Sequence, residues 1–145
     1  HANINQYTKS GSAPIKAAAR GENTIGVAFL HGVVKQAVSG FPVDGVAPCE
    51  GTGYEIGSMS IIDGARNVDE AKMFYDWALS AKAQSEAWKV KSFQVPSNVS
   101  AESSPLAPDP ASINLIDYDF KLYGSSAERK RLLKKWDDEV SVLPQ

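Results

Sequence analysis

A short apolar run, Thr24-Ile25-Gly26-Val27-Ala28-Phe29-Leu30, lies between two helical patterns. A nearly continuous run of this kind is typical of a strand that is buried on both faces, as in a parallel sheet. A helix is expected before it, between Ser12 and Gly21, and a shorter one after it, from Val33 to Ser39. A second strand is expected at residues 43–47. This alternation predicts an α/β fold rather than a sandwich or a helical bundle.

The polar loop Tyr7-Thr8-Lys9-Ser10-Gly11-Ser12-Ala13-Pro14 leads into the first helix. We expect Ser12 to be its N-cap, with Pro14 just inside the first turn, where a missing N–H costs nothing. Unpaired backbone N–H groups, two hydroxyls and the positive end of the helix dipole would then converge on one point. This geometry predicts an anion site; the alternative is that the turn only caps the helix. The residues of the predicted anion site are Ser10, Gly11, Ser12 and Ala13.

A second polar loop, Pro48-Cys49-Glu50-Gly51-Thr52-Gly53-Tyr54-Glu55, follows the second strand, and a third strand is expected over residues 56–62. Loops at the carboxyl ends of parallel strands open at one sheet edge, where ligands bind. Side chains from these loops are therefore expected to meet one ligand. A histidine with two carboxylates suits the hydroxyls of a sugar or polyol, or a cationic amine. The alternatives are a structural role for the histidine and solvated glutamates. The predicted contacts are His31, Glu50, Thr52 and Glu55.

The rest of the chain reads as helices separated by a surface segment. Asn67 is expected to cap a helix that ends near Ser80 and turns Phe74 inward, and a second helical run covers residues 82–91. Residues 97–110, rich in serine and proline, predict a crossing segment without helix or ladder. Ser126 is expected to cap a final helix that reaches Val140.

The length and composition of the chain argue against several classes of function. A chain of 145 residues is normally one domain with a sizeable core. Its net charge of −2 leaves no basic footprint for nucleic acid or an anionic membrane. No apolar run approaches the ~18 residues that span a bilayer, so membrane embedding is not expected. No leader pattern is seen, and His1 is an odd first residue, so the chain is interpreted as a processed or excised piece.

Motifs for catalysis, cofactors and metals are missing. The lone Cys49 excludes an internal disulfide and a multi-thiolate site, and no nucleotide loop, nucleophile elbow or zinc helix occurs. No adjacent tyrosine pair offers the phenolates that a ferric ion prefers. We therefore expect neither a reaction nor a bound cofactor or metal. The alternative of another class is a small α/β enzyme with Cys49 as nucleophile.

The order of these segments resembles the C-terminal half of a bacterial periplasmic solute-binding protein of an ABC transporter, in the type II, ferric-iron-like branch. The resemblance rests on residues 7–14, on Ala18-Ala19-Arg20-Gly21-Glu22, on Ile25-Gly26-Val27-Ala28-Phe29, on residues 48–55 and on Gly64-Ala65. It covers essentially the whole chain.

The resemblance implies part of a three-layer α/β lobe in a two-lobed protein about twice as long, which closes on its ligand like a hinged clamp. It places the ligand-binding lobe in residues 1–62 and a helical return segment, packed on the other lobe, in residues 63–145. It also implies a periplasmic location, an ABC permease as partner and an anionic ligand of the sugar phosphate or phosphonate type. The alternative ligand is ferric iron with a synergistic anion, for which Tyr7 or Tyr54 would replace the missing tyrosine pair.

Overall fold

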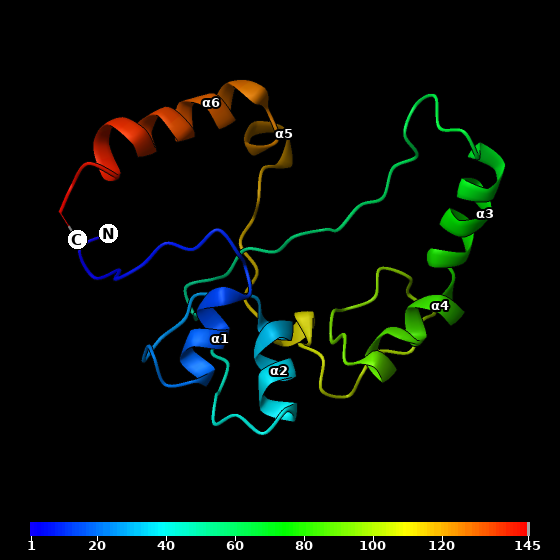
Figure 1. Ribbon diagram of the computed structural model, residues 1–145, viewed down its shortest axis with the longest axis horizontal. Helices are drawn as coiled ribbons and strands as arrows, with labels where there is room; N and C mark the ends of the chain where they lie inside the picture. Colours follow the sequence, from blue (N-terminus) through cyan, green and yellow to red (C-terminus); the bar gives the residue numbers. More distant parts are fainter. Residues whose placement is uncertain (145) are drawn as a thin grey trace. The chain divides into compact units, whose positions relative to one another are not determined.

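The computed structural model describes residues 1–144. Its α-helices, labelled in Figure 1, are Ala13–Ala19 (α1), Leu30–Val38 (α2), Val68–Ala78 (α3), Ala81–Ser85 (α4), Phe120–Tyr123 (α5) and Ser126–Lys135 (α6). Two short 3-10 helices, Ala87–Val90 (η1) and Pro110–Ser112 (η2), and a π-helical turn, Trp136–Val140 (η3), complete the regular structure of this part of the chain.

These elements belong to two compact units. The larger unit is Ser10–Leu115 and contains α1 to α4 with η1 and η2. The smaller unit consists of His1–Lys9 and the segment from Ile116 onward, with α5, α6 and η3. All the ligand contacts predicted from the sequence lie in the larger unit. The units divide the chain at other points than residue 62, and the functional assignment of residues 1–62 and 63–145 stays a prediction.

The first two helices pack beside each other in the larger unit (Figure 1). Ser12 is the N-cap of α1, as predicted, and Gly21 closes the helix with a φ of 74°. α2 begins at Leu30, earlier than predicted, because extended Phe29 is its N-cap and accepts a 2.9 Å hydrogen bond from Gly32 N. His31 therefore lies in the first turn of a helix and not in a loop after a strand.

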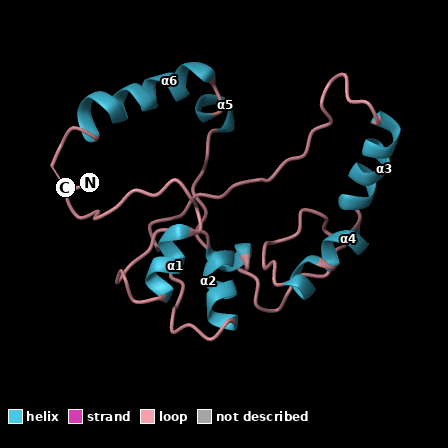
Figure 2. Ribbon diagram, in the orientation of Figure 1, coloured by secondary structure: helices cyan, strands magenta, loops and turns pink. Residues whose placement is uncertain are grey.

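The strands predicted at residues 24–30, 43–47 and 56–62 do not form in residues 1–144, where Figure 2 shows helices and loops. The prediction of strands at these positions is therefore wrong for the described residues. A strand is held by the N–H and C=O groups of a neighbour, and these runs have no neighbouring ladder here. The described chain has one isolated parallel bridge, between Thr52 and Leu115, with Thr52 N donating to Asn114 O at 2.9 Å.

The later helices form where the sequence predicts them, with small corrections. Asn67 is the N-cap of α3, although its side chain makes no capping hydrogen bond. The cap of α6 is Ser125 rather than Ser126, since the Ser125 hydroxyl accepts from Glu128 N at 3.2 Å. The run over residues 82–91 divides into α4 and η1.

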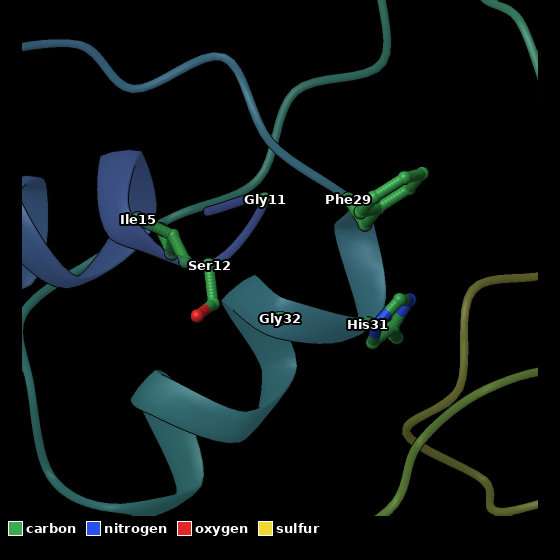
Figure 3. Close-up of a pocket in the computed structure, with 6 residues that line it drawn as sticks. All are labelled: Gly11, Ser12, Ile15, Phe29, His31 and Gly32. Atoms are coloured by element: carbon green, nitrogen blue, oxygen red, sulfur yellow. The ribbon is translucent and has the colours of Figure 1, made fainter. Parts of the chain in front are cut away.

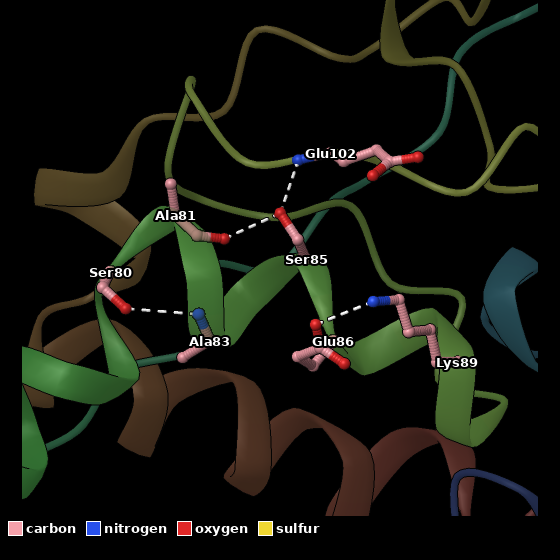
Figure 4. Close-up of polar contacts among 7 residues, drawn as sticks. All are labelled: Ser80, Ala81, Ala83, Ser85, Glu86, Lys89 and Glu102. Carbon is pink, nitrogen blue, oxygen red and sulfur yellow. Dashed lines mark hydrogen bonds and ion pairs between the residues drawn. The ribbon is translucent and has the colours of Figure 1, made fainter.

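Polar side chains join α4 to the crossing segment that follows it (Figure 4). Ser80 caps the helix by accepting from Ala83 N at 3.2 Å. The Ser85 hydroxyl donates to Ala81 O at 2.7 Å and accepts from Glu102 N at 2.8 Å. Serine thus satisfies backbone groups that neither a helix nor a ladder would reach.

The buried core is small. The described apolar residues under one tenth exposed are Ile15, Ala19 and Phe93, at 4%, 6% and 5%. Phe74, which was predicted to face inward, is 61% exposed. A chain of this length normally buries far more apolar surface. Many large apolar side chains of the described residues are therefore exposed to solvent.

Candidate functional site

A pocket of about 200 Å³ lies in the larger unit, between the start of α1 and the start of α2 (Figure 3). Two short stretches of chain build it, one on either side of the first apolar run. Its lining residues are Gly11, Ser12, Ile15, Phe29, His31 and Gly32. The structure therefore brings together three of the contacts predicted from separate loops.

Two glycines, Gly11 and Gly32, line the pocket. A Cβ on Gly11 would lie 3.4 Å from Phe29 Cε2, and one on Gly32 would lie 3.5 Å from Ile15 Cγ2. Both distances are ordinary van der Waals contacts, so the Phe29 ring and the Ile15 side chain lie beside the space that these glycines leave open. The backbone at Gly11 can therefore approach a ligand in the pocket without a side chain in between.

The serine hydroxyls of the first loop are partly engaged with each other. Ser10 Oγ and Ser12 Oγ are 3.3 Å apart, and Ala13 N donates to Ser10 O at 3.1 Å. Ser12 makes no side-chain capping bond, so its hydroxyl is not committed to the helix that it precedes. Ser12 lines the pocket, whereas Ser10 before it and Ala13 after it are not among the lining residues. α1 has only seven residues, and its dipole is correspondingly small.

His31 is the titratable group of the pocket. Its ring stacks on the Phe29 ring, with the centroids 5.5 Å apart and the ring planes inclined by 18°. Partial burial lowers the pKa of His31 from its ordinary value, because the charged form loses solvation. The imidazole is therefore neutral near pH 7 and offers one donor and one acceptor nitrogen.

The predicted contacts of the second polar loop are not among the pocket's lining residues. Glu50 is exposed and accepts from Cys49 Sγ at 3.4 Å, and its pKa is lowered by its own backbone N–H and then by that thiol. Thr52 is tied to residues 114 and 115 through the bridge. Glu55 is exposed. Their contact with the ligand stays a prediction.

The groups named for the alternative functions are not among the lining residues of the pocket either. Cys49 is exposed and its thiol donates a hydrogen bond to the Glu50 carboxylate, with no histidine among its partners. Tyr7 belongs to the smaller unit, where its hydroxyl is 3.1 Å from His1 Nδ1 and its ring packs on Trp136. Tyr54 is 41% exposed. Within residues 1–144, no three His, Cys, Asp or Glu side chains gather as metal ligands.

Sequence reasoning missed half of the pocket lining. Ile15, Phe29 and Gly32 were read as helix or strand residues, although the aromatic ring beside His31 forms a wall of the site. The signal was available in the sequence as Phe29-Leu30-His31-Gly32. The apolar run before His31 suggested only core, so Phe29 was not considered as a wall of a site.

Comparison with known proteins gives close relatives. No model of a protein family matches the chain. An uncharacterized protein of Haemophilus influenzae is 52% identical over 143 residues, which is 98% of this chain and 41% of that protein. The periplasmic binding protein AfuA from Actinobacillus pleuropneumoniae, solved with exogenous fructose-6-phosphate bound, is 54% identical with a TM-score of 0.90. The match covers 97% of this chain and 44% of AfuA.

A second solved structure, the periplasmic binding protein P5PA, is 40% identical with a TM-score of 0.86, over 95% of this chain and 44% of that one. The chain thus spans less than half the length of the proteins it matches. The predicted fold class, a partial α/β lobe of a type II periplasmic binding protein, is confirmed by these likenesses. Among the helices of residues 1–144, none is both long and apolar enough to cross a membrane.

Proposed function

We propose that this chain is part of the solute-binding component of a bacterial ABC import system, which binds an anionic small molecule of the sugar phosphate or phosphonate type. The observation that carries the proposal is the pocket at Gly11, Ser12 and His31, in a chain 54% identical to a protein solved with fructose-6-phosphate. The protein is periplasmic, its partner is the permease of the transporter, and it catalyses no reaction.

The first loop holds the anion in this proposal. The backbone N–H of Gly11 and the hydroxyls of Ser10 and Ser12 donate to phosphate oxygens, as donors around bound anions commonly do. The Ala13 N–H donates to Ser10 O at 3.1 Å in the chain described here, and it joins the site when the ligand displaces that bond. The Gly11 backbone lies open to the pocket, and the Ser12 hydroxyl is not used for capping. These features support the assignment beyond the helix terminus alone.

His31 donates a ring N–H to the same ligand, and Glu50, Thr52 and Glu55 accept from its hydroxyls when the second polar loop meets the cleft. A phosphate beside His31 favours the charged imidazole, so binding takes up a proton. Affinity should therefore rise as the pH falls through the range where free His31 titrates. Replacing His31 with asparagine removes that pH dependence and leaves the ligand's own titration.

The test is a thermal-shift screen of the longer protein that carries this segment. A ligand that binds only the folded state stabilises it by mass action, by about 2.7 kcal/mol at 100 times the Kd, and so raises the melting temperature. Fructose-6-phosphate and phosphonates are expected to shift it, whereas fructose and inorganic phosphate alone shift it less. A shift with ferric salts alone would assign the site to iron and overturn the ligand class.

Two variants test the residues. Ser12→Ala is expected to weaken sugar phosphate binding about tenfold, the loss of one hydrogen bond to a charged group. Ser100→Ala is the matched control, because this exposed serine lies in the crossing segment and outside the pocket. Equal affinities of the two variants would remove Ser12 from the site. Rapid labelling of Cys49 at neutral pH would favour the enzyme alternative, since only a thiolate reacts quickly.

A further inference from the structure

One wall of the pocket is the aromatic ring of Phe29, which lies beside the loop that holds the anion in the proposed function (Figure 3). A Cβ on Gly11 would be 3.4 Å from Phe29 Cε2, so the ring is within reach of a group bound at the Gly11 backbone. The other side chains that line the pocket are those of Ser12, Ile15 and His31. A phosphate ester held at Gly11 and Ser12 would therefore place its carbon frame beside the Phe29 ring.

The Phe29 ring is restrained by a neighbour and still open to the pocket. His31 stacks on it, with the ring centroids 5.5 Å apart and the ring planes inclined by 18°. Phe29 nevertheless remains 47% exposed and is therefore not part of the buried core. Because stacking already limits the freedom of the ring, packing a ligand on it requires little further ordering. Phe29 thus offers a restrained apolar surface to the pocket.

The helix that begins after Phe29 does not explain a phenylalanine at this position. Phe29 is the N-cap of α2, and its side chain makes no capping hydrogen bond. N-caps are preferentially Ser, Thr, Asp or Asn, whose side-chain oxygens accept from the first free N–H groups of the helix. The backbone of Phe29 accepts from Gly32 N at 2.9 Å, a bond that any residue could make. The aromatic side chain therefore serves the pocket rather than the helix.

An aromatic wall beside an anion site distinguishes ring-closed sugars from open chains. A closed sugar ring has its hydroxyls around the edge and C–H groups on its faces, so one face can pack on an aromatic ring while the hydroxyls keep their hydrogen bonds. An open-chain polyol presents hydroxyls in every direction, and burying them against an apolar ring leaves some without partners. The open chain also loses more rotational freedom on binding. Both effects favour the closed ring.

We propose that Phe29 makes this pocket selective for the ring-closed form of a sugar phosphate. The C–H face of the sugar packs on the Phe29 ring while the first loop binds the phosphate, and open-chain phosphates and phosphonates bind more weakly. This inference rests on the proposed function and narrows its ligand class. Ser12 and His31 act by hydrogen bonds, whereas Phe29 acts by contact with the sugar frame. Loss of the aromatic ring therefore changes the choice between ligands more than it changes the binding of the phosphate.

The experiment is titration calorimetry on the longer protein that carries this segment, with two probes that differ in ring closure. Anhydromannitol-6-phosphate is a furanose analogue whose ring cannot open, and sorbitol-6-phosphate is an open chain that cannot close. The ring-closed probe is expected to bind about tenfold more tightly, which corresponds to about 1.4 kcal/mol. Phe29→Leu should bring the two dissociation constants to within about twofold of each other, whereas Phe29→Tyr, which keeps an aromatic ring, should preserve the ratio.

Phe41→Leu is the matched control, because Phe41 is 40% exposed and is not among the lining residues of the pocket, and it should leave the ratio unchanged. Equal affinities of the wild-type protein for the two probes would overturn this inference alone, because the anion would still be bound. A folded Phe29→Leu variant that keeps the wild-type ratio would do the same. Binding of neither probe would contradict the proposed sugar phosphate ligand itself, and this inference with it. The wild-type ratio needs no variant, so the test stands even where Phe29→Leu fails to fold.

Discussion

Residues 79–104 and residues 24–47 both contain segments without regular secondary structure, but the two regions differ in how these segments are stabilised. In the first region, polar side chains complete the backbone: Asn98 Nδ2 donates to Leu79 O at 2.8 Å, and Gln84 Oε1 accepts from Asn98 N at 2.9 Å. In the second, apolar side chains such as Val27 stand exposed and no ladder forms. The first region is closed on itself by local hydrogen bonds, whereas in the second apolar side chains stay exposed and the irregular segments form no ladder.

The largest expected difference between the regions is in their apolar residues. Phe93, in the first region, is 5% exposed, so Phe93→Ala should lower the free energy of unfolding by about 3–5 kcal/mol through lost burial and a cavity. Val27→Ala should change that of the isolated chain by no more than about 0.5 kcal/mol. Urea denaturation measures the unfolding free energy of both variants. Similar losses in the two variants would show that the two regions do not differ in this respect.

The contact between α1 and the first apolar run gives the next effect. Gly26→Ala places a Cβ 2.6 Å from a backbone oxygen, Pro14 O, which cannot swing aside. The resulting strain should cost about 1–3 kcal/mol of unfolding free energy. Gly57→Ala is the matched control, since a Cβ there meets nothing within 4 Å. A Gly26→Ala variant as stable as the control would show that α1 does not rest on this segment.

A smaller effect separates two serine caps. Ser80 accepts from Ala83 N, whereas Ser12 makes no side-chain capping bond. Ser80→Ala should therefore lower the free energy of unfolding by about 1 kcal/mol, and Ser12→Ala by clearly less. Thermal unfolding followed by circular dichroism compares them. The opposite order would mean that Ser12 caps α1 and is not available to a ligand.

The smallest effect is the pH dependence that comes from His31. Burial lowers the pKa of His31 in the folded chain, so the unfolded chain binds the proton more readily. The stability contribution is present above the ordinary histidine pKa of about 6.5 and is lost as the pH falls through it towards the folded value. Denaturation midpoints from pH 8 to pH 5 should fall less in His31→Asn; an equal fall would assign the effect to other groups.

The local structure follows closely from the residues. Pro14 and Gly21 bound α1 as expected, and Asn67 begins α3, because these preferences act within one helical turn. Gly11, Ser12 and His31, which the sequence names from separate segments, line one pocket, and their contact with a ligand stays a prediction. The position of His31 was misread, because an apolar run does not distinguish a strand from the start of a buried helix.

The sequence by itself determined the α/β character, the helices and the first loop of the pocket, since periodicity and capping are properties of neighbouring residues. Only the tertiary structure decided that Phe29 is a wall of the pocket and that Thr52 is bound to residues 114 and 115. It also decided that the apolar run around Val27 stays unpaired in this chain. A strand exists only when a partner supplies its hydrogen bonds, and no pattern within the strand itself specifies where that partner is.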